Sequence, residues 1–251
     1  MLNVLLSGCF GKVSSAVAKI IKDKDNMQVV AGVDICRDMT ADFPTFTNFD
    51  SVTIIPDVVI DFSNPSNLDD LLAFCQKNNI PAVIATTGYN DEQIKKIHSA
   101  AKNIPIFFTF NMSLGVNVLV GLAKNAAKVL GEGFDIEIIE KHHNQKIDAP
   151  SGTAIMIAEA LNNSIEEDMQ YVYDRHSYRE KRKNNEIGIH SVRGGTIVGE
   201  HEVIFAGNDE IISLSHTALS KSLFATGAVK AAEYIATCES GMYDMSSMLN
   251  L

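Results

Sequence analysis

Residues 1–34 read MLNVLLSGCFGKVSSAVAKIIKDKDNMQVVAGVD, and this stretch decides the fold. An apolar run over 3–8 ends at a glycine, and residues 14–25 follow with apolar side chains at helical spacing. A second apolar run covers 27–34. This order predicts a β-α-β unit and therefore a parallel sheet, because two consecutive parallel strands need a long crossover connection between them.

The same alternation continues to about residue 112. Rich Val and Ile content in these runs is typical of strands that are buried on both faces. We therefore predict an α/β fold whose first part, residues 1–112, is a Rossmann-type, doubly wound parallel sheet. The further expected strands cover 57–63, 81–88 and 104–110, and the expected helices between them cover 68–79 and 91–103.

The pattern changes after residue 112. Residues 113–220 are predicted to form a smaller α+β domain with a mixed or antiparallel sheet, for substrate binding and oligomerisation. We expect the last helix, within 221–251, to return to the dinucleotide-binding domain. The elements expected after residue 112 are helices over 113–131, 152–163 and 220–238, strands over 134–143, 186–195, 196–207 and 209–218, and a loop over 173–185.

Composition excludes several classes of protein. The chain has 251 residues, 46% of them hydrophobic and 21% charged, which is the balance of an ordinary globular protein. Its formal net charge of -10 disfavours nucleic-acid and membrane partners. The four cysteines are scattered and no apolar run reaches transmembrane length, so we expect reduced thiols and a cytoplasmic location.

A glycine turn joins the first strand to the first helix. Gly8 and Gly11 would let backbone N–H groups approach a pyrophosphate at the start of the helix. The turn departs from the GxGxxG pattern, because Phe10 and Val13 occupy the second and third glycine positions. The alternative is a tight turn that binds nothing.

Acidic and hydroxyl residues follow other strands of the first domain. Asp34 ends the second strand, where a carboxylate binds the ribose of NAD, whereas Lys12 and Arg37 lie near enough in sequence to pair with the extra phosphate of NADP. Residues 85–88, ATTG, end another strand at the edge where such sheets bind ligands. The alternative for Asp34 and for Thr86 with Thr87 is simple turn chemistry.

A second informative stretch is EKHHNQKIDAPSGTA, residues 140–154. Ser151 is expected to cap a helix, and free N–H groups over 151–153 would then form an anion pocket that Lys146 reaches. His142 and His143 can donate protons near neutral pH, but a regular strand would point them to opposite faces. The alternative is a capped surface helix with solvated histidines. We predict no metal site, because no thiolate or carboxylate lies at a typical ligand spacing from the pair.

A basic run follows the second helix of this domain. Arg175, Arg179, Lys181, Arg182 and Lys183 are predicted to form a solvated loop, and the alternative is a lid that steers anions.

The pattern E-x-H-H-x-x-K-x-D-x-P-S-G-T-A resembles the signature of the 4-hydroxy-tetrahydrodipicolinate reductase family, also called dihydrodipicolinate reductases. The family usually has a different residue at the position of Phe10 and a small one, often Gly, at that of Ser14. The resemblance covers nearly the whole chain in the family's order, through VVIDFS (58–63), VIATTGY (83–89), NMSLGVNVL (111–119), SVRGGTIVGEHEVIFAG (191–207) and SGMYDMSSMLNL (240–251).

The resemblance implies a Rossmann domain completed by the C-terminal segment and a substrate domain whose sheet builds a homotetramer. It also implies NADH- or NADPH-dependent hydride transfer to C4 of a cyclic dicarboxylic imine, with loss of water, in lysine and diaminopimelate biosynthesis. His142 resembles the proton donor and Lys146 its catalytic partner, while His143, Ser151, Gly152 and Thr153 resemble substrate-binding residues. The implied cofactor contacts are Gly8, Cys9, Phe10, Gly11, Lys12, Val13, Asp34, Phe62, Ala85, Thr86, Thr87, Phe110, Asn111, Met112 and Ser113.

Two rival functions remain open from the sequence. Another two-domain NAD(P)-dependent amino-acid dehydrogenase would share the Gly8 turn but would not need residues 140–154. A non-catalytic dinucleotide sensor would bind cofactor without hydride transfer. Asp34 favours NADH, whereas Lys12 and Arg37 favour tolerance of NADPH, so we expect dual use.

Overall fold

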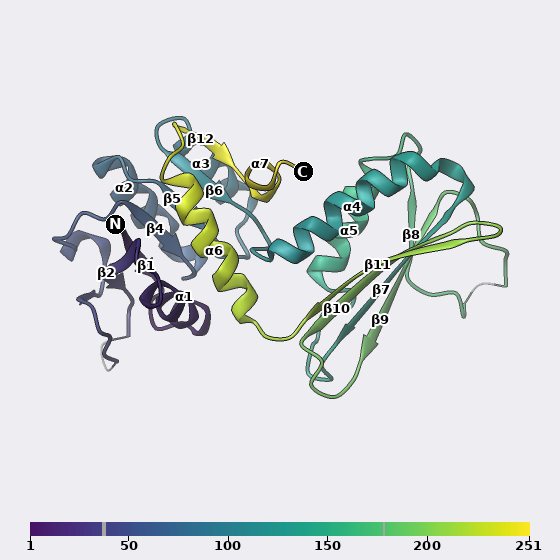
Figure 1. Cartoon of the computed structure of the whole chain (residues 1–251), viewed down its shortest axis with the longest axis horizontal. Coiled ribbons are helices and arrows are strands. Elements are labelled where there is room, and N and C mark those ends of the chain that lie inside the picture. The colour runs from purple at the N-terminus through teal and green to yellow at the C-terminus, as the bar shows by residue number, and fades with distance from the viewer. Residues whose placement is uncertain (37–38, 178) are drawn as a thin grey trace. The chain divides into compact units, whose positions relative to one another are not determined.

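The computed structural model describes residues 1–36, 39–177 and 179–251. The chain divides into two compact units (Figure 1). The first unit contains Met1–Leu114 and Ser222–Asn250, and the second contains Gly115–Lys221 with Leu251. The roles predicted for them, dinucleotide binding for the first and substrate binding with tetramerisation for the second, stay predictions.

The first unit is built on a seven-stranded sheet in the order β12-β6-β5-β4-β1-β2-β3. All neighbouring strands are parallel. From β1 the chain first adds β2 and β3 on one side and then β4, β5 and β6 on the other. This reversal places a crevice beyond the carboxyl ends of β1 and β4, which is where such sheets bind ligands. The strands are β1 (Leu2–Ser7), β2 (Met27–Val33), β3 (Thr45–Phe46), β4 (Val58–Asp61), β5 (Ala82–Ile84), β6 (Pro105–Phe108) and β12 (Gly241–Tyr243).

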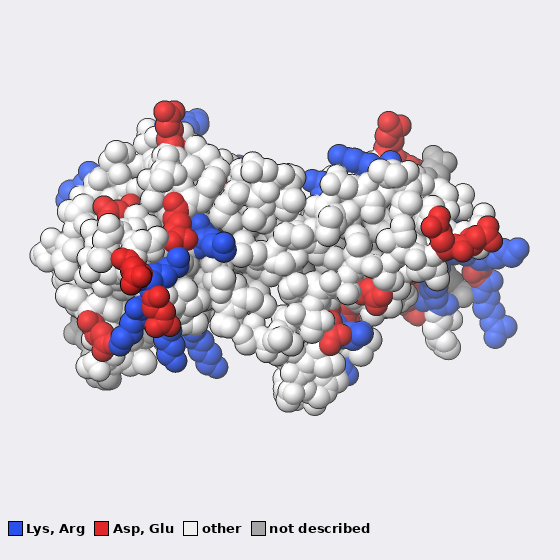
Figure 2. All heavy atoms as spheres, viewed as in Figure 1, with Lys and Arg blue, Asp and Glu red and all other residues white. Residues whose placement is uncertain are grey.

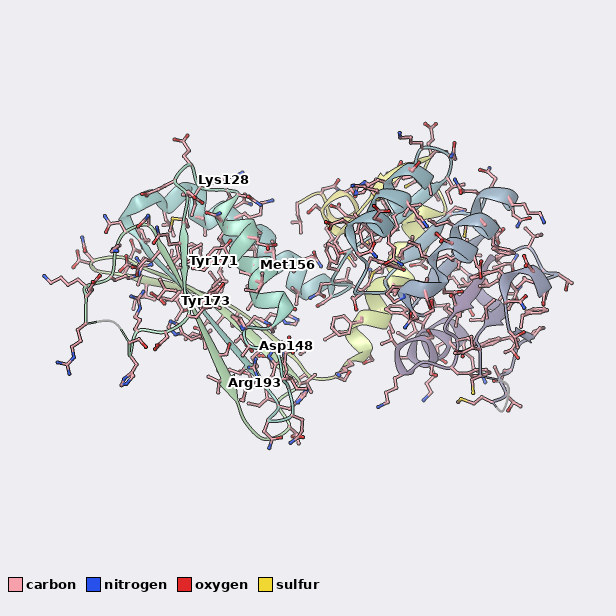
Figure 3. The ribbon with its side chains drawn as sticks, turned by 180° about the vertical axis from the view of Figure 1, so that it is seen from behind. Lys128, Asp148, Met156, Tyr171, Tyr173 and Arg193 are labelled. Atoms are coloured by element: carbon pink, nitrogen blue, oxygen red, sulfur yellow. The ribbon has the colours of Figure 1, made fainter. Side chains whose placement is uncertain are left out.

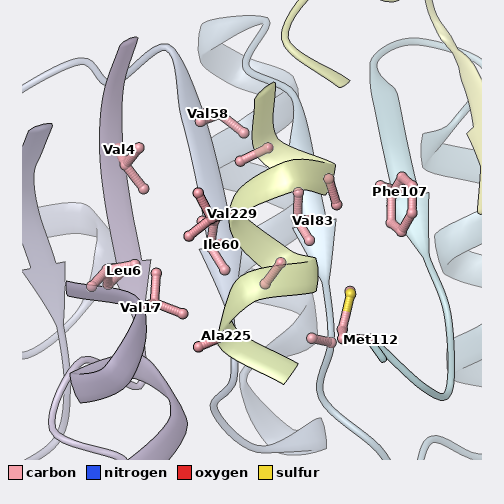
Figure 4. Packing of buried hydrophobic residues seen from close by; sticks show 14 of the residues in the cluster. Val4, Leu6, Val17, Val58, Ile60, Val83, Phe107, Met112, Ala225 and Val229 are labelled. Carbon is pink, nitrogen blue, oxygen red and sulfur yellow. The ribbon is translucent and has the colours of Figure 1, made fainter. Parts of the chain in front are cut away.

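Helices cover both faces of this sheet. On one face, α1 and α6 pack over side chains from β1, β4, β5 and β6 (Figure 4). On the other face, α2 and α3 cover a second apolar cluster. Strand residues such as Val4, Leu5, Val59 and Ile60 are fully buried, which explains the near-continuous apolar runs. The helices are α1 (Lys12–Lys22), α2 (Leu68–Asn78), α3 (Asp91–Ala100), α6 (Ser222–Ile235) and α7 (Met245–Leu249).

The second unit has a five-stranded mixed sheet in the order β11-β10-β7-β9-β8. Strand β10 is antiparallel to β7 and β11, whereas β7, β9 and β8 are parallel. Helices α4 and α5 lie on one face of this sheet (Figure 1). The predicted fold class is thereby confirmed. The elements are α4 (Leu114–Leu130), β7 (Asp135–His142), α5 (Gly152–Asn162), β8 (Gln170–Val172), β9 (Glu186–Arg193), β10 (Gly199–Ala206) and β11 (Ile211–Ala218).

The prediction of a solvated basic loop is wrong for Arg182. Its guanidinium donates to Glu137 Oε1 at 3.0 Å and to Asp135 Oδ1 at 2.7 Å, and only 16% of its side chain is exposed. It also donates to the backbone oxygens of Ile136 and Glu186. These acceptors lie on β7 and β9, and those on β7 are distant in sequence, so the Arg182 side chain fixes the loop to the sheet.

The distribution of charged side chains and the length of the helices can be compared with the expectations from composition. Figure 2 shows acidic and basic side chains interspersed on the face that it displays, with no large area of one sign. In the described part of the chain, no helix is both long enough and apolar enough to span a membrane.

Candidate active site

The glycine turn after β1 requires glycine at position 8. Gly8 has a φ of 71°, in the left-handed region. A Cβ at this position would lie 2.7 Å from the backbone oxygen of Phe62. Gly11 is the N-cap of α1 and has no side-chain capping bond. The first N–H groups of α1 therefore form a cradle suited to a phosphate.

Asp34 stands over this turn. Its carboxylate accepts hydrogen bonds from the N–H groups of Phe10 and Cys36, both at 3.0 Å. The acidic side chain is thereby fixed beside the helix N-terminus. Lys12 is exposed at the first position of α1. Arg37, the other basic residue considered for NADP, lies outside the described residues.

A cavity of about 490 Å³ opens at this edge of the sheet, a size suited to a small-molecule site. Gly8, Gly11, Asp34 and Phe62 are the predicted cofactor residues that line it. A glycine cradle that a Cβ would fill, an uncapped helix start and a fixed carboxylate fit a dinucleotide. The rest of the lining comes from Val33, Ile35, Thr47, Ser63, Asn64, Ser66 and Asn67.

The other predicted cofactor residues are placed in different ways. Thr87 and Phe110 are exposed, and the exposed fraction of Phe110 is 62%. Cys9 and Met112 are buried within the core cluster of the first unit, so their side chains serve packing. Val13 and Phe10 lie half-buried against the same core. The residues Ala85, Thr86, Asn111 and Ser113 are buried.

Asp61, which is buried at the end of β4, was not among the predicted site residues. Its carboxyl accepts hydrogen bonds from Thr86 Oγ1 at 2.6 Å and Ser63 Oγ at 2.5 Å. Burial raises the pKa of Asp61, and the hydroxyl donors, which include Ser7, oppose that shift. One carboxyl thus joins residues that follow β4 and β5, at the sheet edge where the cofactor is expected.

We expect Gly8→Ala to weaken dinucleotide binding at least about tenfold and to lower the stability by roughly 1–2 kcal/mol. An alanine at a φ of 71° is strained, and its Cβ would overlap the Phe62 oxygen. Fluorescence titration with NADH and thermal unfolding measure both effects. Gly194→Ala is a control, since the nearest atom to its added Cβ is 4.0 Å away. Unchanged NADH affinity in Gly8→Ala would contradict the prediction that the Gly8 turn binds the dinucleotide.

The second candidate site begins on the helix-covered face of β7. Alternate residues Ile136, Ile138, Glu140 and His142 point to this face and are buried. The strand therefore carries two core residues and then a carboxylate and an imidazole. His142 Nδ1 lies 2.6 Å from Glu140 Oε2. His143, the next residue, is half-buried beyond the strand end, so the two histidines are placed differently.

Glu140 is fully buried, and hydrogen-bond donors around its carboxylate offset the cost of burying its charge. Arg193, the last residue of β9, donates to Oε2 at 2.9 Å and to Oε1 at 2.7 Å in a bidentate pair. Burial alone would raise the pKa of Glu140. Hydrogen bonds from Arg193, Ser191, His142 and the Ser151 N–H outweigh burial and lower the pKa from 4.5 to about 2.

This depressed pKa predicts how stability depends on pH. The ionised form of Glu140 is favoured in the folded chain, so its contribution is fully present above pH 4.5 and is lost as pH falls toward 2. The loss should be on the order of 2–3 kcal/mol. Urea unfolding between pH 7 and pH 2 measures it. Glu140→Gln should lack this part of the pH dependence, and an identical profile in both proteins would refute the prediction.

The start of α5 faces the same pair. Ser151 caps the helix by accepting the Ala154 N–H at 3.2 Å on its Oγ. The expectation that the Ser151 N–H would be free is wrong, because it donates to Glu140 Oε1 at 3.1 Å. Gly152 is exposed, and a Cβ added there would meet no atom within 4 Å. With Thr153, half-buried on the same turn, Gly152 forms an accessible helix N-terminus.

Lys146 lies in the loop between β7 and α5. Its N–H donates to the His143 oxygen at 3.1 Å, and its Nζ pairs with Asp148 Oδ1 at 2.8 Å. The Lys146 ammonium lowers the pKa of the Asp148 carboxyl. Only 22% of the Lys146 side chain is exposed. A cation is thus held in the loop that leads from His143 to the start of α5.

A second histidine packs against the His142 ring. His201 on β10 is buried, and its ring lies 5.3 Å from the His142 ring in an edge-to-face arrangement. His201 Nε2 lies 3.1 Å from Ser151 Oγ. Burial, followed by repulsion from His142, lowers the pKa of His201 to about 4. His201 is therefore neutral at pH 7.

The described residues hold no group of three or more His, Cys, Asp or Glu side chains arranged for a metal ion. Three residues of the second site were not predicted to act there. Glu140 belongs to the quoted motif, and its spacing of two residues from His142 was a usable sign that both side chains share one face. Arg193 and His201 come from β9 and β10, and no local pattern links them to β7.

Comparison with known proteins covers the whole chain. The family model described as dihydrodipicolinate reductase, N-terminus, matches residues 2–112, and the one described as dihydrodipicolinate reductase, C-terminus, matches residues 115–249. A 4-hydroxy-tetrahydrodipicolinate reductase of Caldanaerobacter subterraneus subsp. tengcongensis is 51% identical over 249 residues, which are 99% of this chain and 98% of that protein. The 4-hydroxy-tetrahydrodipicolinate reductase of Clostridium tetani is 48% identical over 250 residues, which are 100% of this chain and 98% of that protein.

A solved structure is similar over the same extent. It is a dipicolinate-bound dihydrodipicolinate reductase from Paenisporosarcina sp. TG-14, with a TM-score of 0.83 and 27% sequence identity. The match covers 98% of each chain.

Proposed function

This chain belongs to the dihydrodipicolinate reductase family, and from that membership we propose how its residues carry out the reaction. The activity is the reduction of 4-hydroxy-tetrahydrodipicolinate with a nicotinamide dinucleotide, a step of lysine and diaminopimelate biosynthesis. The observation that carries the proposal is the buried Glu140–His142 pair beside the start of α5.

The substrate is a cyclic dicarboxylate, and the second unit offers two groups for its negative charges. The N–H groups of Gly152 and Thr153, at the positive end of the α5 dipole, bind one carboxylate. The Lys146 ammonium and His143 bind the other, with Lys146 sharing its charge between the substrate and Asp148. Charge-assisted hydrogen bonds of this kind give both affinity and orientation.

The cofactor, when bound, supplies the hydride that reduces C4 of the substrate. Gly8, Gly11 and the first turn of α1 would hold its pyrophosphate, and Asp34 would hold a ribose. Reduction leaves an electron-rich, enamine-like substrate that must be protonated. His142 donates that proton from its imidazolium, and Lys146 assists by keeping the carboxylate and the ring in place.

A steady-state assay tests the proposal. The substrate is generated from pyruvate and aspartate semialdehyde, and the loss of absorbance at 340 nm is followed with NADH and with NADPH. We expect turnover with both reduced cofactors, and no gain of absorbance at 340 nm when simple amino acids are offered with NAD+ or NADP+. Turnover of amino acids alone would favour the dehydrogenase rival. Cofactor binding without absorbance change in a stopped-flow trace would favour the sensor rival.

Asp34 decides the preference between the two cofactors. Its fixed carboxylate accepts hydrogen bonds from a ribose diol and repels a 2′-phosphate. We expect Asp34→Ala to raise KM for NADH about tenfold and to leave KM for NADPH equal or lower. The ratio of kcat/KM values measures this, with Asp50→Asn, an exposed aspartate outside the cavity lining, as the control. An unchanged ratio would remove Asp34 from cofactor selection.

We also propose that the chain forms a homotetramer through the sheet of the second unit. The helices cover one face of that sheet, and apolar side chains remain exposed elsewhere on it, including Val192 at 45% and Ile211 at 68%. Sedimentation should give a mass four times that of one chain.

A further inference from the structure

We propose that Glu140 and Arg193 are positioning residues for proton transfer: Glu140 holds the His142 ring with its proton on Nδ1, so that Nε2 is the atom that gives a proton to the substrate. Arg193 holds the Glu140 carboxylate in place. This inference rests on the proposed function, because it assigns the atom through which His142 acts.

The first argument is that Arg193 and the Ser151 N–H, which hold the Glu140 carboxylate together with His142, can only donate hydrogen bonds. His142 Nδ1 and Arg193 Nη1 lie 2.6 Å and 2.9 Å from Oε2. Arg193 Nη2 and the Ser151 N–H lie 2.7 Å and 3.1 Å from Oε1. A carboxylate held by these donors stays ionised and can only accept hydrogen bonds. The hydrogen between Glu140 and His142 therefore belongs to Nδ1.

The second argument concerns the other edge of the ring. A Cβ added at Gly199, the first residue of β10, would lie 3.0 Å from His142 Nε2. The absence of a side chain at Gly199 thus leaves room beside the Nε2 edge of the ring. His201 packs edge-to-face on the same ring. Glu140, Gly199 and His201 thus lie around the imidazole, and 11% of the His142 side chain is exposed.

The proton balance follows from this orientation. During transfer, the Nε2–H bond of the imidazolium breaks, its electron pair stays on Nε2, and the proton forms a new bond to the electron-rich substrate. The neutral ring that remains carries hydrogen on Nδ1, still bonded to Glu140. A fixed carboxylate beside Nδ1 supports both charge states of the ring in one position, as in the Ser-His-Asp arrangement.

Arg193 also contacts the loop between β7 and α5, which contains Lys146 and Asp148. It faces His142 in the β7–β9 register, and its Nη2 also donates to the backbone oxygen of Asp148 at 2.6 Å. Figure 3 shows Asp148 and Arg193 at the same end of the sheet. Asp148 pairs with Lys146. The Arg193 guanidinium therefore connects Glu140, which positions His142, with the loop that carries the Lys146 ammonium.

The test compares Glu140→Gln with Glu200→Gln. Glu200 pairs with Lys141 and is partly exposed, so it is a matched control. We expect Glu140→Gln to lower kcat on the order of 10²-fold, with KM and NADH affinity changed less than about threefold. In ¹⁵N-histidine spectra, neutral His142, assigned with His142→Asn, should carry hydrogen on Nδ1 in the parent protein and gain Nε2–H character in Glu140→Gln.

A double-variant comparison separates positioning from a general structural role. In the His142→Ala background, adding Glu140→Gln should lower kcat no further, because Glu140 acts through the missing ring. A further loss there, or an unchanged Nδ1–H tautomer with parental kcat in Glu140→Gln, would overturn the inference. If Glu140→Gln does not fold, Arg193→Lys is read by the same spectra and kinetics. The spectra need no turnover, so an active His142→Ala would refute the proposed function and leave this test intact.

Discussion

Replacement of His142 by alanine lowers kcat about 10²–10⁴-fold and leaves dinucleotide affinity unchanged. The imidazole is the proposed acid and lies beside the helix N-terminus where we expect the substrate to bind. Its neighbour His201, with a pKa of about 4, is not protonated at pH 7 and cannot replace it. The proposed cofactor site is made of residues of the first unit, so we expect the substitution to leave it unaltered. Single-turnover kinetics measure the proton-dependent step, and NADH titration measures binding.

His98→Ala is the control for that experiment, because His98 is an exposed residue of α3 in the first unit. It should turn over at the parental rate. A fully active His142→Ala protein would refute the role of His142 as proton donor.

Replacement of Lys146 by methionine has the second largest effect that we expect. In the proposed function the ammonium donates a charge-assisted hydrogen bond to a substrate carboxylate, so its loss should raise KM about 10–100-fold and also lower kcat. Steady-state kinetics over a wide substrate range separate the two parameters. Lys141→Met is a matched control, since Lys141 pairs with Glu200 on β10.

The neighbouring aspartate sharpens this prediction. Asp148→Asn removes the carboxylate that pairs with Lys146, so KM should stay equal or fall. If Asp148→Asn raised KM as much as Lys146→Met, the ion pair itself, rather than a cation shared with the substrate, would be the functional unit.

Long periodic segments made the fold predictable from sequence. The runs over 3–8 and 27–34 flank a helical pattern, and the β-α-β unit they predict is β1, α1 and β2. The strands β3, β8 and β12 were not predicted, because each has only two or three residues and shows no period. Their positions depend on pairing with longer strands rather than on local preference.

The site was predictable where its chemistry is local. The Gly8 turn and the Ser151 cap depend on residues a few positions apart. The face of His142 was ambiguous, since two adjacent histidines on a strand point in opposite directions. Pairing of β7 on both sides resolves it, because Ile136 and Ile138 fix the buried face. The use of the Ser151 N–H by Glu140 could not be foreseen, since it required the backbone path between them.

The central claim is that the second unit binds a dicarboxylate at the start of α5, beside His142. A crystal structure of the chain with pyridine-2,6-dicarboxylate tests it most directly. We predict one carboxylate within hydrogen-bond distance of the Gly152 and Thr153 N–H groups, the other at Lys146, and His142 Nε2 facing the ring. Ligand density confined to the outer face of the sheet or to the first unit would contradict the account.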